Sequence, residues 1–142
     1  EQWQWLSQKM YTNTDYRFII SSIQFLAIGH GWECWNNFPY ERERLIDLID
    51  RSNVKHTVLL SGDRHRGGHY ELKTKNNKII SEMTSSSLNV PYSNSEEPGP
   101  LRIGSTYSEE NYGVIKIVES QDSISVMLKN IRGEVVTSFK LR

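Results

Sequence analysis

The stretch HTVLLSGDRHRGGHYEL, residues 56–72, breaks an apolar run at a glycine and then brings an acid, two arginines and two histidines close together. Asp63 offers a hard anionic oxygen, and His65 offers an imidazole nitrogen that binds metal ions when the ring is neutral. Arg64 and Arg66 can bind a phosphate, because a planar guanidinium matches two phosphate oxygens. We therefore expect Asp63 and His65 within a few ångströms of each other or of a common ion.

The spacing of this stretch leaves a second interpretation open. Asp63 can cap a turn and pair with an arginine, while His65 lies on the surface. A D-x-H pattern is short and occurs by chance. The spacing by itself does not choose between a metal site and an ordinary surface turn.

Residues 30–35 contain further groups that can do chemistry. His30 follows a predicted strand and could be a third metal ligand, although a histidine in that place is more often structural. Cys34 could bind iron or zinc, but a single cysteine without partner spacing is more often an inert buried thiol. We expect Trp32 and Trp35 to close the core beneath the next helix. The alternative is that they line the rim of a site and hold the organic group of a substrate.

The elements that must position these residues alternate as in α/β proteins. Residues 16–29 are rich in β-branched and aromatic types, which predicts one strand, or two with a bend between them. Pro39 suits the first turn of a helix, and an amphipathic pattern predicts that helix from 39 to about 52. Residues 56–62 are typical of a short buried strand. SGDRH follows directly, at the carboxyl end of a strand, where ligands gather in such sheets.

The second half of the chain alternates with period two, which predicts antiparallel sheet. Turn signals occur at Lys75–Lys78 and at Arg132–Gly133. The segment Ser87–Glu110 is rich in Ser, Pro and Gly and shows neither period. We expect it to be a long loop and the least regular or most mobile part of the chain.

The composition limits the classes of function. The chain has 142 residues, the size of one domain, with 17 basic and 17 acidic side chains, so no net charge attracts nucleic acid or an anionic membrane. A single cysteine excludes an internal disulfide. No apolar run approaches the ~20 residues of a membrane span. The sequence begins at Glu1 inside a helical pattern, without a targeting segment, so we expect further protein upstream.

Three motifs occur in order along the chain: W-x-x-F-P-x-E-R from Trp35 to Arg42, then S-G-D-R-H, then E-M-T-S-S. Their order and spacing resemble the C-terminal part of the PhoD-like alkaline phosphatases and phosphodiesterases, which are calcineurin-like metallophosphoesterases. The resemblance implies a four-layer α/β/β/α fold. Residues 1–142 would supply the C-terminal part of that domain, with an α/β first half and an antiparallel β second half.

The resemblance also implies roles for individual residues. Most metallophosphoesterases carry G-H-x-H at this strand end, and Gly62, Asp63 and His65 occupy the matching places. Asp63 and His65 would therefore bind metal. His65 would also be catalytic, as a ligand, as a group near the attacking water, or as the acid that protonates the departing alkoxide. The phosphate would be bound by four residues: Arg64, Arg66, Thr84 and Ser85. The alternative for the hydroxyl pair is that it simply ends a strand.

The implied activity is hydrolysis of phosphate mono- or diesters with two metal ions, which would be iron and/or calcium, or zinc or manganese. The other ligands of such a site lie in an N-terminal half whose motifs are not in this chain. The chain by itself should therefore bind metal weakly and be inactive. The resemblance implies an extracytoplasmic protein, secreted or periplasmic. The alternative is a non-catalytic α/β binding module that shares the fold, and the upstream sequence distinguishes the two.

Overall fold

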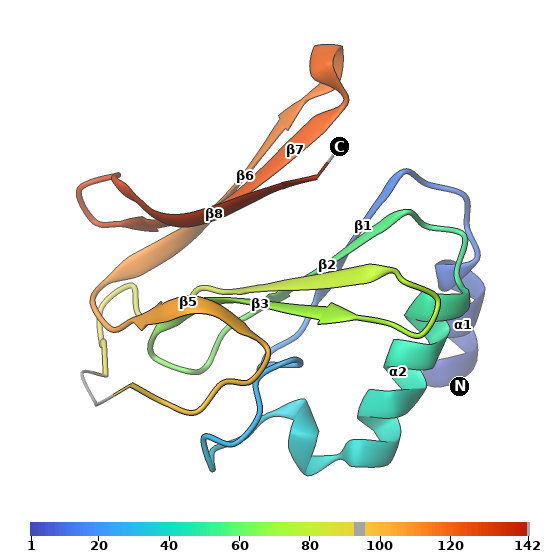
Figure 1. Cartoon of the computed structure of the whole chain (residues 1–142), viewed down its shortest axis with the longest axis horizontal. Coiled ribbons are helices and arrows are strands. Elements are labelled where there is room, and N and C mark those ends of the chain that lie inside the picture. Colours follow the sequence, from blue (N-terminus) through green and yellow to red (C-terminus); the bar gives the residue numbers. More distant parts are fainter. Residues whose placement is uncertain (93–95, 142) are drawn as a thin grey trace.

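A computed structural model describes residues 1–92 and 96–141 (Figure 1). Within these residues the strands form two sheets, one in the order β1-β2-β4-β3-β5 and the other in the order β6-β7-β8. The elements are α1 (Gln2–Met10), β1 (Tyr16–Ile20), η1 (Trp35–Asn37), α2 (Pro39–Arg51), β2 (His56–Ser61), β3 (Gly67–Lys73), β4 (Ile79–Thr84), β5 (Arg102–Tyr107), β6 (Asn111–Val118), η2 (Glu119–Gln121), β7 (Ser123–Asn130) and β8 (Val135–Leu141). None of the helices in these ranges is long and apolar enough to cross a membrane.

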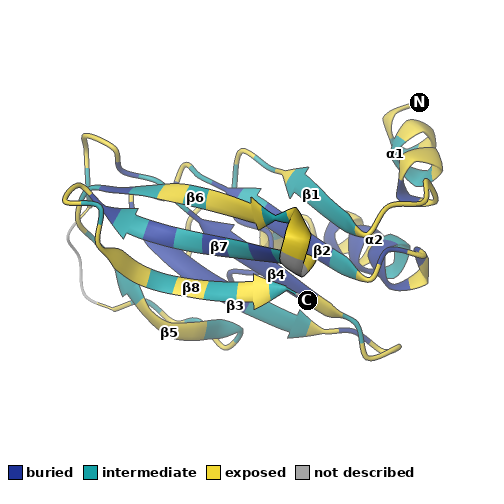
Figure 2. Cartoon of the chain, turned by 90° about the horizontal axis from the view of Figure 1, so that it is seen from above, coloured by how far each residue is buried: buried dark blue, intermediate teal, exposed yellow. Residues whose placement is uncertain are grey.

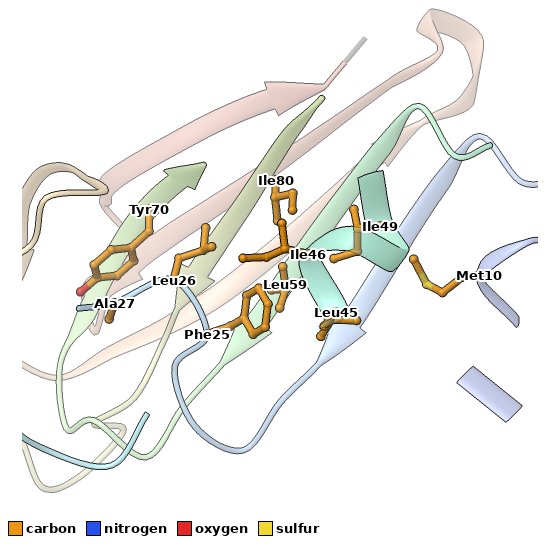
Figure 3. Close-up of a cluster of buried hydrophobic side chains, with 10 residues drawn as sticks. All are labelled: Met10, Phe25, Leu26, Ala27, Leu45, Ile46, Ile49, Leu59, Tyr70 and Ile80. Carbon is orange, nitrogen blue, oxygen red and sulfur yellow. The ribbon is translucent and has the colours of Figure 1, made fainter. Parts of the chain in front are cut away.

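Helix α2 fixes the central strands of the first sheet. Pro39 begins the helix, as predicted, because its fixed φ suits the first turn. Leu45 and Ile49 of α2 belong to one buried cluster with Leu59 of β2 and Ile80 of β4 (Figure 3). Burying each of these side chains contributes about 1.5–3 kcal/mol. The packing therefore holds β2, and the turn that follows it, against a rigid helix.

Strands β1, β2 and β4 run parallel, so their carboxyl ends meet at one edge of the sheet. Ile20 is paired with Leu60 across β1 and β2, and Ser61 is paired with Thr84 across β2 and β4. The turn beginning at Gly62 starts at this edge. Its neighbours in space are the ends of two other strands, which is the arrangement that the sequence predicts for a ligand site.

The second sheet covers the face of the first sheet that lies away from α2 (Figure 2). Val58 of β2 and Met83 of β4 pack against Ile124, Val126 and Leu128, and the burial of residues along β7 alternates accordingly. The layers are thus helix, mixed sheet and antiparallel sheet. This confirms the predicted fold class, an α/β first half followed by an antiparallel second half, consistent with the C-terminal portion of the layered fold.

The strand predicted over residues 16–29 ends early, at Ile20. Phe25 and Leu26 stay fully buried outside any strand, because their backbone N–H groups donate to the Glu82 carboxylate instead of to a neighbouring strand. The predicted turns are confirmed: Asn77 and Gly133 have φ of 65° and 80°, the left-handed conformation that tight turns use. Strand β4, predicted as part of an antiparallel sheet, is antiparallel to β3 but parallel to β2.

The prediction of an irregular segment over Ser87–Glu110 is wrong for β5, which spans Arg102–Tyr107. This strand pairs antiparallel with the outer edge of β3, whose backbone groups would otherwise face solvent. Gly104, with φ of 74°, interrupts the alternation and hides the strand from the sequence pattern. Residues 87–92 and 96–101 contain neither helix nor strand, as predicted, and 93–95 lie outside the described residues.

His69 of β3 lies buried between the two sheets, only 4% exposed. Its ring stacks on Phe139 of β8 with ring centroids 4.4 Å apart, and its Nε2 lies 3.3 Å from Oε1 of Glu71. Burial lowers the pKa of His69 against the opposing effect of Glu71. Since the folded pKa is below the unfolded value of about 6.5, this group stabilises the fold above that pH, and the contribution is lost as pH falls through the folded pKa.

We expect His69→Phe, which keeps a ring against Phe139, to lose less stability than the unsubstituted chain between about pH 7 and pH 5. Urea unfolding at a series of pH values measures this difference. His30, whose pKa is also lowered by burial, is present in both proteins and cancels in the comparison. Parallel pH profiles for the two proteins would show that His69 is not the group that titrates.

Candidate active site

In the turn after β2, the side chains of successive residues face alternately toward solvent and toward the interior. Asp63 and His65 have φ of 63° and 54°, a region that non-glycine residues enter at a cost of about 1–2 kcal/mol. Both are exposed, whereas Arg64 and Arg66 between and after them are 8% and 1% exposed. Such local strain collects at functional sites. The structure thus presents the predicted metal ligands to solvent at the carboxyl end of a central strand. That they share an ion stays a prediction.

His65 is held from three sides. Its Nδ1 lies 2.6 Å from the carbonyl oxygen of Val90, its backbone N–H donates to Oγ of Ser86, and its carbonyl accepts from the N–H of Tyr92. A carbonyl oxygen only accepts, so Nδ1 carries the proton and a neutral ring keeps its lone pair on Nε2. Metal-binding histidines are oriented in this way by a hydrogen bond from the other ring nitrogen. The residue therefore fits a metal ligand.

Within the described residues, no three or more His, Cys, Asp and Glu side chains lie grouped as a metal site would require. If Asp63 and His65 bind metal, they would supply only part of a donor set: an anionic oxygen and an imidazole nitrogen, suited to the borderline and hard metals that the resemblance implies.

The two arginines of the turn face inward, toward one carboxylate. Arg64 forms an ion pair with Glu97, and Nη1 of Arg66 lies 3.6 Å from the same oxygen. Arg66 also donates to the carbonyl of Tyr92 at 3.2 Å. Burial, and then the nearby Arg66, lower the pKa of the Arg64 guanidinium. The structure therefore does not bring these arginines to the surface beside Asp63, and their contact with a phosphate stays a prediction.

Thr84 and Ser85 differ in their surroundings. The Thr84 side chain is fully buried, and its hydroxyl lies 2.9 Å from Oγ of Ser61 and accepts from Gln24 at 2.9 Å. Ser85 is half-buried and lines a groove of about 410 Å³ that also borders Gly62. In this arrangement Ser85 is open to a small ligand and Thr84 is not. Their predicted phosphate contacts remain untested.

The sequence analysis missed a buried carboxylate beneath the turn. Glu82 is 0% exposed and accepts from the N–H groups of Phe25 and Leu26, at 2.8 and 2.5 Å, and from Oγ of Ser61 at 2.6 Å. Burial raises the pKa of Glu82, and the three hydrogen bonds oppose that effect. Because Ser61 immediately precedes the turn, Glu82 ties the turn to the segment 24–27. The signal available in the sequence was an acid inside the apolar strand IISEMT.

His30 is placed differently from a metal ligand. Its Nδ1 accepts from the backbone N–H of Trp32 at 3.0 Å, so a neutral ring carries its proton on Nε2. That Nε2 is buried and lacks a hydrogen-bond partner in the part of the chain that the structure describes. Burial, and then Arg64, lower the pKa of His30. The contact with Trp32 favours the structural interpretation of His30, and its role as a metal ligand stays untested.

The predictions for Cys34 and the two tryptophans of this segment are confirmed in part. Cys34 is buried and free, as expected of an inert thiol. Trp35 packs edge-to-face on Phe25 at 5.1 Å between centroids and joins the core, which confirms its prediction. The core prediction is wrong for Trp32, which is 54% exposed. The glycines on either side of His30 have positive φ, and this loop carries the Trp32 ring out of the core.

The sequence profile of the PhoD-like phosphatases matches residues 1–141. The chain belongs to the PhoD-like phosphatase family. Among curated proteins, this PhoD-like chain is similar to alkaline phosphatase D of Bacillus subtilis (strain 168), with 27% identity over 56% of this chain and 16% of that protein. A solved structure described as "Structure of PhoD" superimposes with a TM-score of 0.74 and 17% identity, covering 99% of this chain and 32% of the other.

The structural match shows that the PhoD-like chain shares the fold of that solved structure, and the profile match shows its family. The matches also show that this chain spans less than a third of the length of the solved chain and a smaller share of the curated relative. The matches alone therefore do not show that this chain has the activities of the longer relatives.

Proposed function

We propose that this chain supplies the C-terminal part of a binuclear metal site that hydrolyses phosphate mono- or diesters, with Asp63 and His65 as metal ligands. The observation that carries the proposal is the hydrogen bond from Nδ1 of His65 to the Val90 carbonyl. It leaves Nε2 as an oriented lone pair on an exposed turn, in a chain of the PhoD-like phosphatase family.

This geometry supports the metal-ligand role among the roles considered for His65. With Nδ1 donating to Val90, a neutral ring can accept at Nε2, as a metal ligand does, but cannot donate there. Protonating a departing alkoxide would require the imidazolium form. The bound metals, whether iron, calcium, zinc or manganese, would supply Lewis-acid stabilisation of the charge that develops on the phosphoryl oxygens. The residues of the turn would hold them and orient the ester.

The buried arginines support the proposal through charge. Arg64 forms an ion pair with Glu97, and Nη1 of Arg66 lies 3.6 Å from the same carboxylate oxygen, so two guanidinium groups lie beneath the turn. A positive charge beneath the turn favours an anionic ester above it, even without direct contact. Direct binding by Arg64 or Arg66 would require Glu97 to release a guanidinium. Ser85, on the groove beside Gly62, is the better placed of the two hydroxyl residues.

The remaining ligands would come from the N-terminal part of the same protein. Within the described residues, no strand pairs with the outer edge of β1, whose Ile20 is 82% exposed. A groove of about 840 Å³ between α1 and β1 is lined largely by apolar side chains, among them Trp3, Trp5 and Ile23. An open parallel edge beside an apolar groove is suited to continuation of the sheet. "The whole protein" below means this chain joined to that part.

Metal binding tests the proposal directly. In the whole protein we expect Asp63→Asn and His65→Gln each to weaken Mn²⁺ or Zn²⁺ binding by about tenfold or more, because each removes a ligand. Equilibrium dialysis measures the affinity. His56→Gln is the matched control, since His56 lies at the opposite end of the same strand. Equal affinities in all four proteins would contradict the assignment of Asp63 and His65.

A further inference from the structure

We propose that Trp32 and Tyr92 form a subsite that binds an aromatic group on the phosphate ester. The inference rests on the proposed function and adds a substrate class to it. Both rings are exposed, Trp32 by 54% and Tyr92 by 42%, yet they pack edge-to-face with centroids 6.3 Å apart. They come from loops far apart in the sequence. An exposed ring pair brought together in this way is a feature of binding surfaces.

The ring pair is connected to the turn that carries the candidate metal ligands. The backbone N–H of Tyr92 donates to the carbonyl of His65 at 3.0 Å. The guanidinium of Arg64, which lies between Asp63 and His65 in sequence, is 5.4 Å from the centre of the Trp32 ring. Both rings therefore adjoin the turn that carries Asp63 and His65, and an ester held at that turn would place its organic group against them.

The same contacts fix the rings before a ligand arrives. The cation–π contact with Arg64 holds Trp32, and the ion pair with Glu97 in turn holds Arg64. Two hydrogen bonds, from Tyr92 to His65 and from Arg66 to Tyr92, hold the backbone of Tyr92. A rigid aromatic surface loses little entropy on binding a planar group. It favours such a group over a small alkyl group through ring–ring contact.

The test compares phenyl phosphate with ethyl phosphate as substrates of the metal-loaded whole protein. We expect Trp32→Ala and Tyr92→Ala to lower kcat/KM for phenyl phosphate by about tenfold, mainly through KM, and to leave ethyl phosphate unchanged. The two esters differ in intrinsic reactivity. This difference cancels because the kcat/KM of each variant is compared with that of the parent protein for the same ester. Trp32→Phe should restore most of the loss. Tyr40→Ala, an exposed aromatic on α2, is the matched control and should change neither substrate.

Equal losses for both esters, or no loss for either, would overturn the subsite. Binding of phenylphosphonate and ethylphosphonate, measured by calorimetry, separates this outcome from failure of the proposed function because it needs no turnover. If the whole protein hydrolyses no ester, the proposed function fails. The subsite then stands only if phenylphosphonate binds more tightly than ethylphosphonate and Trp32→Ala abolishes that preference. An unchanged preference in that variant would overturn it.

Discussion

We expect Glu82→Ala to lower the free energy of unfolding of the chain by about 2–6 kcal/mol. The change removes the acceptor of two buried backbone N–H groups, those of Phe25 and Leu26, and each unsatisfied buried donor costs about 1–3 kcal/mol. It also removes the acceptor of the Ser61 hydroxyl. Urea unfolding followed by circular dichroism measures the effect.

Two variants control for other consequences of removing an acid. Glu82→Gln keeps the size and one acceptor oxygen, so it should lose less stability than Glu82→Ala. Glu33→Ala removes an exposed acid and should stay within about 0.5 kcal/mol of the parent chain. If Glu82→Ala unfolds at the same urea concentration as the parent, the buried carboxylate does not hold the segment 24–27 to the sheet.

The regular elements could be predicted because their signals are local. Pro39 and an apolar stripe mark α2, TVLL marks a strand buried on both faces, and Asn77 and Gly133 stand at the tips of turns. Each pattern depends on neighbours within a few positions. Strand β5 gave no such signal, because Gly104 breaks its alternation and the paired residues of β3 lie 32 to 40 positions earlier in the chain.

The turn itself could be found from residue types, but the directions of its side chains could not. Left-handed backbone at both Asp63 and His65 turns the arginines inward, and only the folded chain places Glu97 to receive them. Spacing likewise does not reveal that Val90 sets the tautomer of His65. These features depend on contacts between distant segments.

The largest functional effect should follow from His65→Ala in the whole protein. We expect kcat for a phosphodiester to fall by roughly 10- to 100-fold or more, because the change removes a metal ligand from the site. The loss should be specific to the imidazole, because Ser86 and Tyr92 hold the turn through hydrogen bonds to the backbone of His65, which the variant keeps. His56→Ala, at the other end of β2, should leave kcat unchanged.

The most direct test of the account is turnover of bis(p-nitrophenyl) phosphate at saturating metal by three proteins: the whole protein, its His65→Ala variant, and the 142-residue chain. The account predicts metal-dependent turnover by the whole protein, a large loss in the variant, and only background hydrolysis by the chain. Turnover by the chain would show that its site is complete without further ligands. An unaffected variant would contradict the role assigned to the turn after β2. An inactive whole protein would favour a non-catalytic binding module.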